Sequence, residues 1–122
     1  MDLQLSLKIN WFEMTKKRIK KEDYRDITPY WCNRLMTFDG KIMPKDFWVD
    51  IAKGFSNGYF YHRADFREFD NNIMTLGYPL KTDLSRIKKF KHAGIHIGIG
   101  NEAWGAIPNK IYFVIKHGDI LI

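Results

Sequence analysis

The chain of 122 residues is short of cysteine and of long apolar runs, and it contains no internal repeat. Its single cysteine, Cys32, excludes an intrachain disulfide and a cysteine-based zinc site, and it fits a reducing compartment. The first residues lack the basic start and apolar stretch of a signal peptide, and no segment approaches the length of a membrane span. We therefore expect a cytoplasmic protein that does not enter a membrane.

Acidic residues are also scarce: the chain has 14 carboxylates and 20 lysines and arginines, which gives a net charge of +6. The excess lies in two segments. Residues 15–25 hold six basic and two acidic side chains, and residues 81–92 hold five basic and one acidic. Two basic clusters on a near-neutral body are typical of a protein that binds phosphates. The alternative is a pair of solvated faces that keep the protein soluble.

Local patterns predict short elements in the first third of the chain. Leu3, Leu5 and Leu7 alternate with polar residues, which indicates a half-buried strand. Thr28 and Pro29 form a helix start, with threonine as N-cap and proline at the first helical position. We further expect Asn10 to cap a short helix over 11–15, a strand over 19–26, and a helix that continues from Tyr30 to Met36.

The rest of the chain predicts turns, strands and a basic helix. We expect turns at Asp39-Gly40 and at Ser56-Asn57-Gly58, with a helix or strand over 46–53 and a loop over 63–72. A basic helix capped by Thr82 or Asp83 is expected to run through Lys91. Strands are expected over 93–99 and 111–115, and a last short strand after Gly118-Asp119. Strands at both ends with short helices between them favour one α+β domain, as a small barrel or curled sheet.

The segment from Lys20 to Trp31 concentrates cations, carboxylates and aromatic rings. In a regular strand Lys21, Asp23 and Arg25 share one face, while Lys20 and Tyr24 lie on the other. Arg25 suits a phosphate or a base edge, and the rings of Tyr24, Tyr30 or Trp31 suit base stacking. The alternative is a salt bridge from Asp23 to Arg25 or a lysine that ties helix to strand.

The same segment resembles the ASCH family (activating signal cointegrator homology domains) of the PUA-like superfamily. Its signature is Gly-x-Lys-x-x-Glu-x-Arg after the first helix, and Lys20, Asp23 and Arg25 fall on the Lys, Glu and Arg positions. Small phage-type and bacterial members continue with Asp-x-Thr-Pro-Tyr-Trp, which resembles residues 26–31. The signature glycine is Arg18 here, and the glutamate is the shorter Asp23.

Three further segments support the resemblance: residues 5–12, 55–59 and 95–116. It implies a PUA-like small mixed β-barrel flanked by short helices, formed by a single domain over 1–122. Residues 61–92 match least and are expected to form an insertion.

The resemblance implies an RNA- or nucleotide-binding module with a basic and aromatic cleft. The expected nucleic-acid-binding residues are Lys20, Lys21, Tyr24, Arg25, Trp31 and Tyr59. One alternative is an enzyme on RNA or a modified nucleoside, with Lys20, Asp23 and Arg25 as its catalytic residues. Amidohydrolase relatives carry a nucleophilic threonine where Asp23 stands, which argues against their reaction. The other alternative is a phage protein that binds a host protein or a nucleotide signal.

Other motifs predict no cofactor and no metal. His92 and His96 are four residues apart, but Gly94 and Ile95 between them argue against a helical ligand pair. Gly98-Ile99-Gly100 lacks the spacing of a dinucleotide fingerprint and indicates a loop that leaves a strand. We interpret Cys32 as a packing residue rather than a nucleophile.

Overall fold

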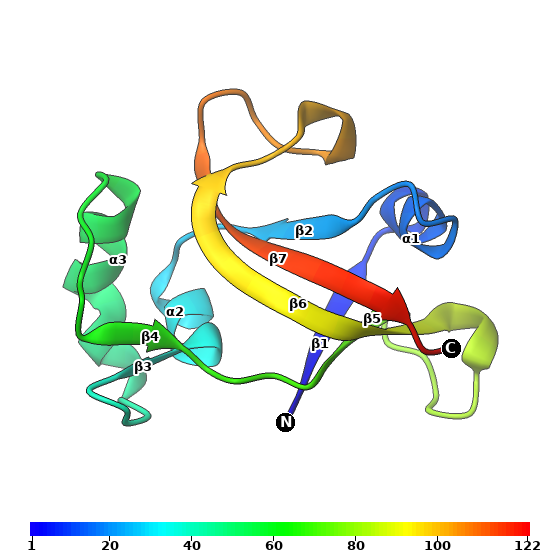
Figure 1. Ribbon diagram of the computed structural model, residues 1–122, viewed down its shortest axis with the longest axis horizontal. Coiled ribbons are helices and arrows are strands. Elements are labelled where there is room, and N and C mark those ends of the chain that lie inside the picture. The colour runs from blue at the N-terminus through cyan, green and yellow to red at the C-terminus, as the bar shows by residue number, and fades with distance from the viewer. The chain divides into compact units, whose positions relative to one another are not determined.

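The computed structural model describes residues 1–122 as an α+β chain with a five-stranded mixed sheet, a two-stranded sheet and short helices (Figure 1). In the larger sheet the strand order is β1-β5-β6-β7-β2, with β1 and β5 parallel and β5 and β6 antiparallel. The elements are β1 (Asp2–Leu7), α1 (Ile9–Lys16), β2 (Glu22–Arg25), α2 (Pro29–Leu35), β3 (Met36–Phe38), η1 (Lys45–Trp48), α3 (Val49–Ser56), β4 (Ala64–Phe66), β5 (Asn71–Leu76), η2 (Leu84–Arg86), β6 (Ile87–Ile99), η3 (Glu102–Trp104) and β7 (Ile111–Ile120).

The chain forms two compact units. The first comprises Met1–Asp23, Glu68–Gly94 and Ile115–Ile122, and the second comprises Tyr24–Arg67 and Ile95–Val114. Strands β2, β6 and β7 each pass from one unit into the other. Each unit has its own buried side chains.

In the first unit, the predicted period of two places one face of β1 in the interior. Leu3, Leu5 and Leu7 are buried, and β1 pairs along its whole length with β5. Helix α1 contacts β5 and buries Phe12 and Thr15. Thr15 Oγ1 donates a hydrogen bond to the Trp11 carbonyl at 2.8 Å, which satisfies its hydroxyl inside the helix.

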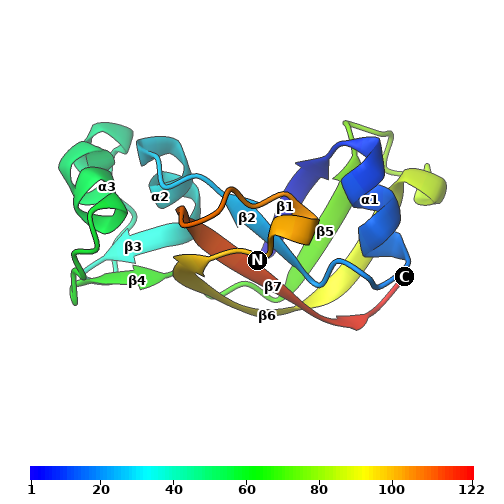
Figure 2. The same ribbon diagram turned by 90° about the horizontal axis from the view of Figure 1, so that it is seen from above.

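In the second unit, α2, η1 and α3 lie next to one another, and β3 pairs antiparallel with β4 (Figure 2). Helix α2 begins as predicted. Thr28 Oγ1 accepts a hydrogen bond from the Trp31 backbone N–H at 3.2 Å, and Pro29 fills the first helical position. The helix buries Cys32 and Leu35 on one side, which leaves Tyr30 on the exposed side.

Several local predictions are corrected. Asn10 is not the cap of α1, because the helix begins one residue earlier at Ile9 and the capping position is Lys8, whose side chain makes no cap hydrogen bond. The turn expected at Ser56-Asn57-Gly58 begins one residue later, at Asn57, because Ser56 is the last residue of α3. The expected loop over 63–72 contains β4 and the start of β5. Gly118 and Asp119 lie within β7 instead of preceding a separate strand.

The basic helix predicted through Lys91 is wrong. Only η2 is helical there, and Ile87 to Ile99 form one long strand that includes the predicted strand over 93–99. Residues 87–91 pair with β5, which buries Phe90 and leaves the lysines on either side of it nearer the surface. This pairing stabilises a strand that the local lysine-rich pattern does not reveal.

Residues 61–92 supply β4, β5 and the beginning of β6. Strand β4 belongs to the second unit, whereas β5 lies between β1 and β6 in the larger sheet and is part of the first unit's framework. None of the helices has both the length and the apolar character that crossing a membrane requires.

Candidate functional site

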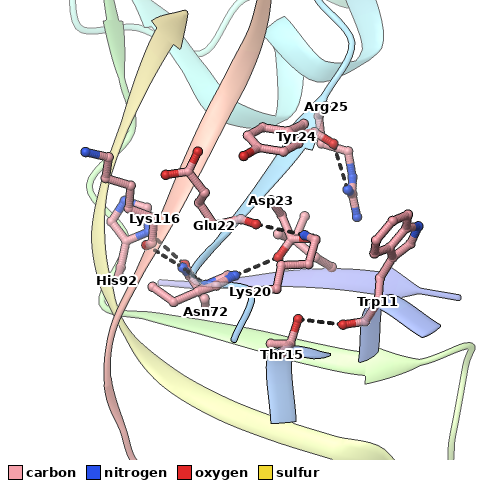
Figure 3. A network of polar contacts seen from close by, with 12 residues as sticks. Trp11, Thr15, Lys20, Glu22, Asp23, Tyr24, Arg25, Asn72, His92 and Lys116 are labelled. Carbon is pink, nitrogen blue, oxygen red and sulfur yellow. Dashed lines mark hydrogen bonds and ion pairs between the residues drawn. The ribbon is translucent and has the colours of Figure 1, made fainter. Parts of the chain in front are cut away.

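Lys20 and Asp23 form a buried ion pair in the first unit (Figure 3). Only 3% of Lys20 and 1% of Asp23 is exposed. Lys20 Nζ donates to an Asp23 carboxylate oxygen and also to the Glu22 carbonyl at 2.7 Å. Because β2 begins only at Glu22, strand alternation does not extend back to Lys20, which lies in the irregular segment between α1 and β2.

Asp23 is ionised in this environment. Burial raises the pKa of its carboxyl group. The hydrogen bond from His117 and the charge of Lys20 outweigh this effect and bring the pKa down to about 2. Both carboxylate oxygens have partners, since Oδ1 pairs with Lys20 and Oδ2 lies 2.6 Å from His117 Nε2. The carboxylate therefore has the hydrogen bonds that a buried charge requires.

A fully buried asparagine, Asn72 of β5, orients the His117 ring. Its Nδ2 donates to the Lys116 carbonyl at 2.9 Å, and this contact sets the orientation of the amide. The same Nδ2 lies 2.9 Å from His117 Nδ1, which must accept. His117 therefore donates from Nε2 to the Asp23 carboxylate.

The polar network ends at His92 on β6. Its Nδ1 lies 2.7 Å from Asn72 Oδ1, an acceptor, so His92 donates from Nδ1. Burial lowers the pKa of His92, which favours the neutral ring. In Figure 3, Asn72 lies between Lys20 and His92. Sequence reasoning missed Asn72 and His117, which lie 45 residues apart along the chain and have no motif that marks them as partners.

Lys21 and Tyr24 lie in different surroundings from the ion pair. Lys21 is exposed and precedes the strand. In the second unit, Tyr24 Oη accepts from the Asn101 backbone N–H at 2.7 Å, and its ring lies 5.6 Å from that of Tyr112. A side chain at Gly100 would come within 2.7 Å of the Tyr24 ring, so the glycine after β6 permits close packing.

Arg25, Trp31, Arg34 and Tyr30 form a cluster in the second unit, here called the Trp31 cluster. The Arg34 guanidinium carbon lies 4.7 Å from the centre of the Trp31 ring, and that of Arg25 lies at 5.2 Å. Tyr30 meets Trp31 edge to face at 5.2 Å, and 49% of Tyr30 is exposed. Residues i+3 and i+4 share a helix face, so α2 itself brings Arg34 to both rings.

A groove of about 350 Å³ lies between the start of α2 and one side of α3. Its volume is within the range of small-molecule sites, roughly 300–1,000 Å³. The lining is mainly apolar, with hydroxyl, amide and ammonium groups from Thr28, Ser56, Asn57 and Lys53. The apolar part is formed by Ile27, Pro29, Val49 and Ala52.

Two aromatic side chains follow the groove residue Asn57 in the chain. Tyr59 is 70% exposed and Phe60 is 80% exposed. The Tyr59 ring lies 6.4 Å from that of Tyr61, which in turn contacts Phe55 of α3. The predicted ligand residue Tyr59 is thus accessible.

Cys32 is fully buried, and burial raises the pKa of its thiol to about 12. It is an unreactive packing residue, as its position in the sequence indicates.

Comparison of the chain with models of known protein families, with curated proteins and with solved structures finds no match.

Proposed function

We propose that the chain binds RNA or a nucleotide, with the Trp31 cluster and the groove of the second unit as the contact surface. The observation that carries this proposal is the placement of two guanidinium groups over the Trp31 ring, next to the half-exposed Tyr30. Guanidinium groups pair with phosphates, and aromatic faces stack bases. Polar groups in the groove, such as Asn57 and Lys53, suit the hydrogen-bonding edge of a base.

We also propose the PUA-like assignment on the resemblance at residues 20–31. The α+β chain with a mixed sheet is consistent with it. Within that resemblance, Arg25 belongs to the Trp31 cluster, whereas Lys20 and Asp23 are buried and paired with each other. A ligand does not reach these two side chains in this conformation, so the geometry supports binding more than catalysis by Lys20 and Asp23.

The proposal is tested by titrating a fluorescent single-stranded RNA with the protein at low salt. Replacing Trp31 with leucine removes the stacking ring and is expected to cost about 1–3 kcal/mol of binding, roughly 5- to 150-fold in Kd. Arg34→Gln is expected to weaken binding as well. Lys41→Gln removes the same charge from an exposed position outside the cluster and serves as the matched control.

Thermal unfolding of each variant shows whether its fold is intact. Absence of RNA and nucleotide binding by the wild-type protein at low salt would overturn the proposal and favour the alternative of a host-protein partner. Equal losses of affinity in Arg34→Gln and Lys41→Gln would show that general charge, rather than the Trp31 cluster, accounts for the binding.

A further inference from the structure

The first unit carries basic side chains on the open face of its sheet. In the β5–β6 register, Asn71 pairs with Lys91, Asn72 with Phe90 and Ile73 with Lys89. Asn72 and Phe90 are buried on one face. Because side chains alternate along a strand, Lys89 and Lys91 lie on the opposite face.

Lys116 of β7 lies on the same face as these two lysines. Its neighbour His117 points to the buried side, where its ring lies 5.3 Å from Phe90. Lys116 and Gly118 therefore point the other way. A side chain at Gly118 would lie 3.1 Å from the Lys91 carbonyl oxygen, which places β7 directly beside β6 at this point. Lys89, Lys91 and Lys116 are called the lysine face.

The lysine face is open to approach. Lys91 and Lys116 are exposed, Lys89 is partly exposed, and none of the three forms an ion pair. Gly118 has no side chain to cover the surface beside Lys91. A ligand can therefore reach all three ammonium groups from one side of the sheet.

Two side-chain carboxylates lie on the same side of the sheet, towards its two edges, and the terminal carboxylate of Ile122 lies beside Lys89, whose backbone N–H donates to the Ile122 oxygen at 3.4 Å. Asp2 of β1 is two strands from Lys91, and its oxygen accepts a hydrogen bond from Asn71 Nδ2 at 3.0 Å. Glu22 of β2 precedes the buried Asp23, so alternation places it on the open side. The three lysines occupy the strands between these edges and outnumber the Ile122 carboxylate beside Lys89, so the middle of the face carries a net positive charge.

We propose that the lysine face contacts the phosphates of an RNA chain, and hence that the ligand is a polymer rather than a free nucleotide. This inference rests on the function proposed above. Residues i and i+2 of a strand lie about 7 Å apart, so Lys89 and Lys91 present ammonium groups in a row that suits successive phosphates. A single nucleotide held at the Trp31 cluster does not require three further cations on another unit.

The test is the salt dependence of binding to a single-stranded oligouridylate, with uridine monophosphate as the comparison ligand. The variants are a triple Lys89→Gln, Lys91→Gln, Lys116→Gln protein and a control with Lys8→Gln, Lys41→Gln, Lys45→Gln. The control removes the same charge from exposed lysines off the face. Each phosphate that is no longer neutralised by a lysine reduces the slope of log K against log salt by about 0.7 for a single strand.

We expect the lysine-face triple to reduce the slope for oligouridylate by about 2, and the control to change it much less. Affinity for uridine monophosphate is expected to stay the same in both. An unchanged slope in the lysine-face triple, with wild-type RNA binding intact, overturns this inference alone. If wild-type protein binds neither ligand, the proposed function fails instead. Lys91→Gln alone, with an expected reduction of about 0.7, tests the inference should the triple variant not fold.

Discussion

Asn72 is the side chain that joins the buried polar groups of the first unit. Its amide donates to the Lys116 carbonyl and to His117, and it accepts from His92. An aspartate in its place would lose both donors and add a second buried carboxylate near Asp23. Satisfying every polar group of such a network gives it a single arrangement, whereas one unpaired member is costly.

Lys20 and Lys21 are adjacent in sequence and differ sharply in their surroundings. Lys20→Met leaves the buried Asp23 carboxylate without its cation, so we expect a loss of about 3–5 kcal/mol in the free energy of unfolding. Lys21→Met changes an exposed position and is expected to stay within about 0.5 kcal/mol of wild type. Urea denaturation of the two variants measures the difference, and equal stabilities would contradict a structural role for the ion pair.

Because of Asp23, we expect the folded protein to lose stability in acid. Its pKa is about 2 in the folded state, against an ordinary value of 3.8. The depressed pKa contributes stability that is fully present above pH 3.8 and is lost as the pH falls towards 2. The contribution is about 2 kcal/mol. Denaturation curves across this range should show a steeper loss in wild type than in Asp23→Asn, and parallel curves would contradict the assignment.

The sequence indicates that Asp23 has a cationic partner, but it does not identify the whole network. Strict alternation groups Lys21 with Asp23, whereas the family pattern marks Lys20. The residue that pairs with Asp23 is Lys20, because both lysines precede the regular strand and alternation does not apply to them. His117 lies 94 residues from Asp23 and meets it only because β7 brings it there. No local pattern carries that information.

Helix α2 and strand β6 show which elements can be predicted from local residues. Two adjacent residues, Thr28 and Pro29, determine the start of α2, so the local capping signal is sufficient to predict it. Strand β6 depends on pairing with β5, and lysine-rich residues with good helix propensity hide it. Each element also positions charge: α2 brings Arg34 to Trp31, and β6 places Lys89 and Lys91 on one face.

Across the whole molecule, burial separates the residues that hold the fold from those that are open to a ligand. The first unit contains the buried network of Lys20, Asp23, Asn72 and His117. The second unit contains the Trp31 cluster and the groove. This division explains why variants at Lys20 would confuse loss of stability with loss of binding, whereas variants at Arg34 do not remove a buried charge.

The most direct measurement is the NMR spectrum of the tryptophan indole N–H groups during titration with single-stranded RNA. We predict that the Trp31 resonance shifts in a saturable way as a base stacks on the Trp31 cluster. Trp48 is fully buried and is the internal reference, so its resonance is expected to stay in place. RNA binding that leaves Trp31 unshifted, or an RNA titration that shifts no resonance, would contradict the proposed function.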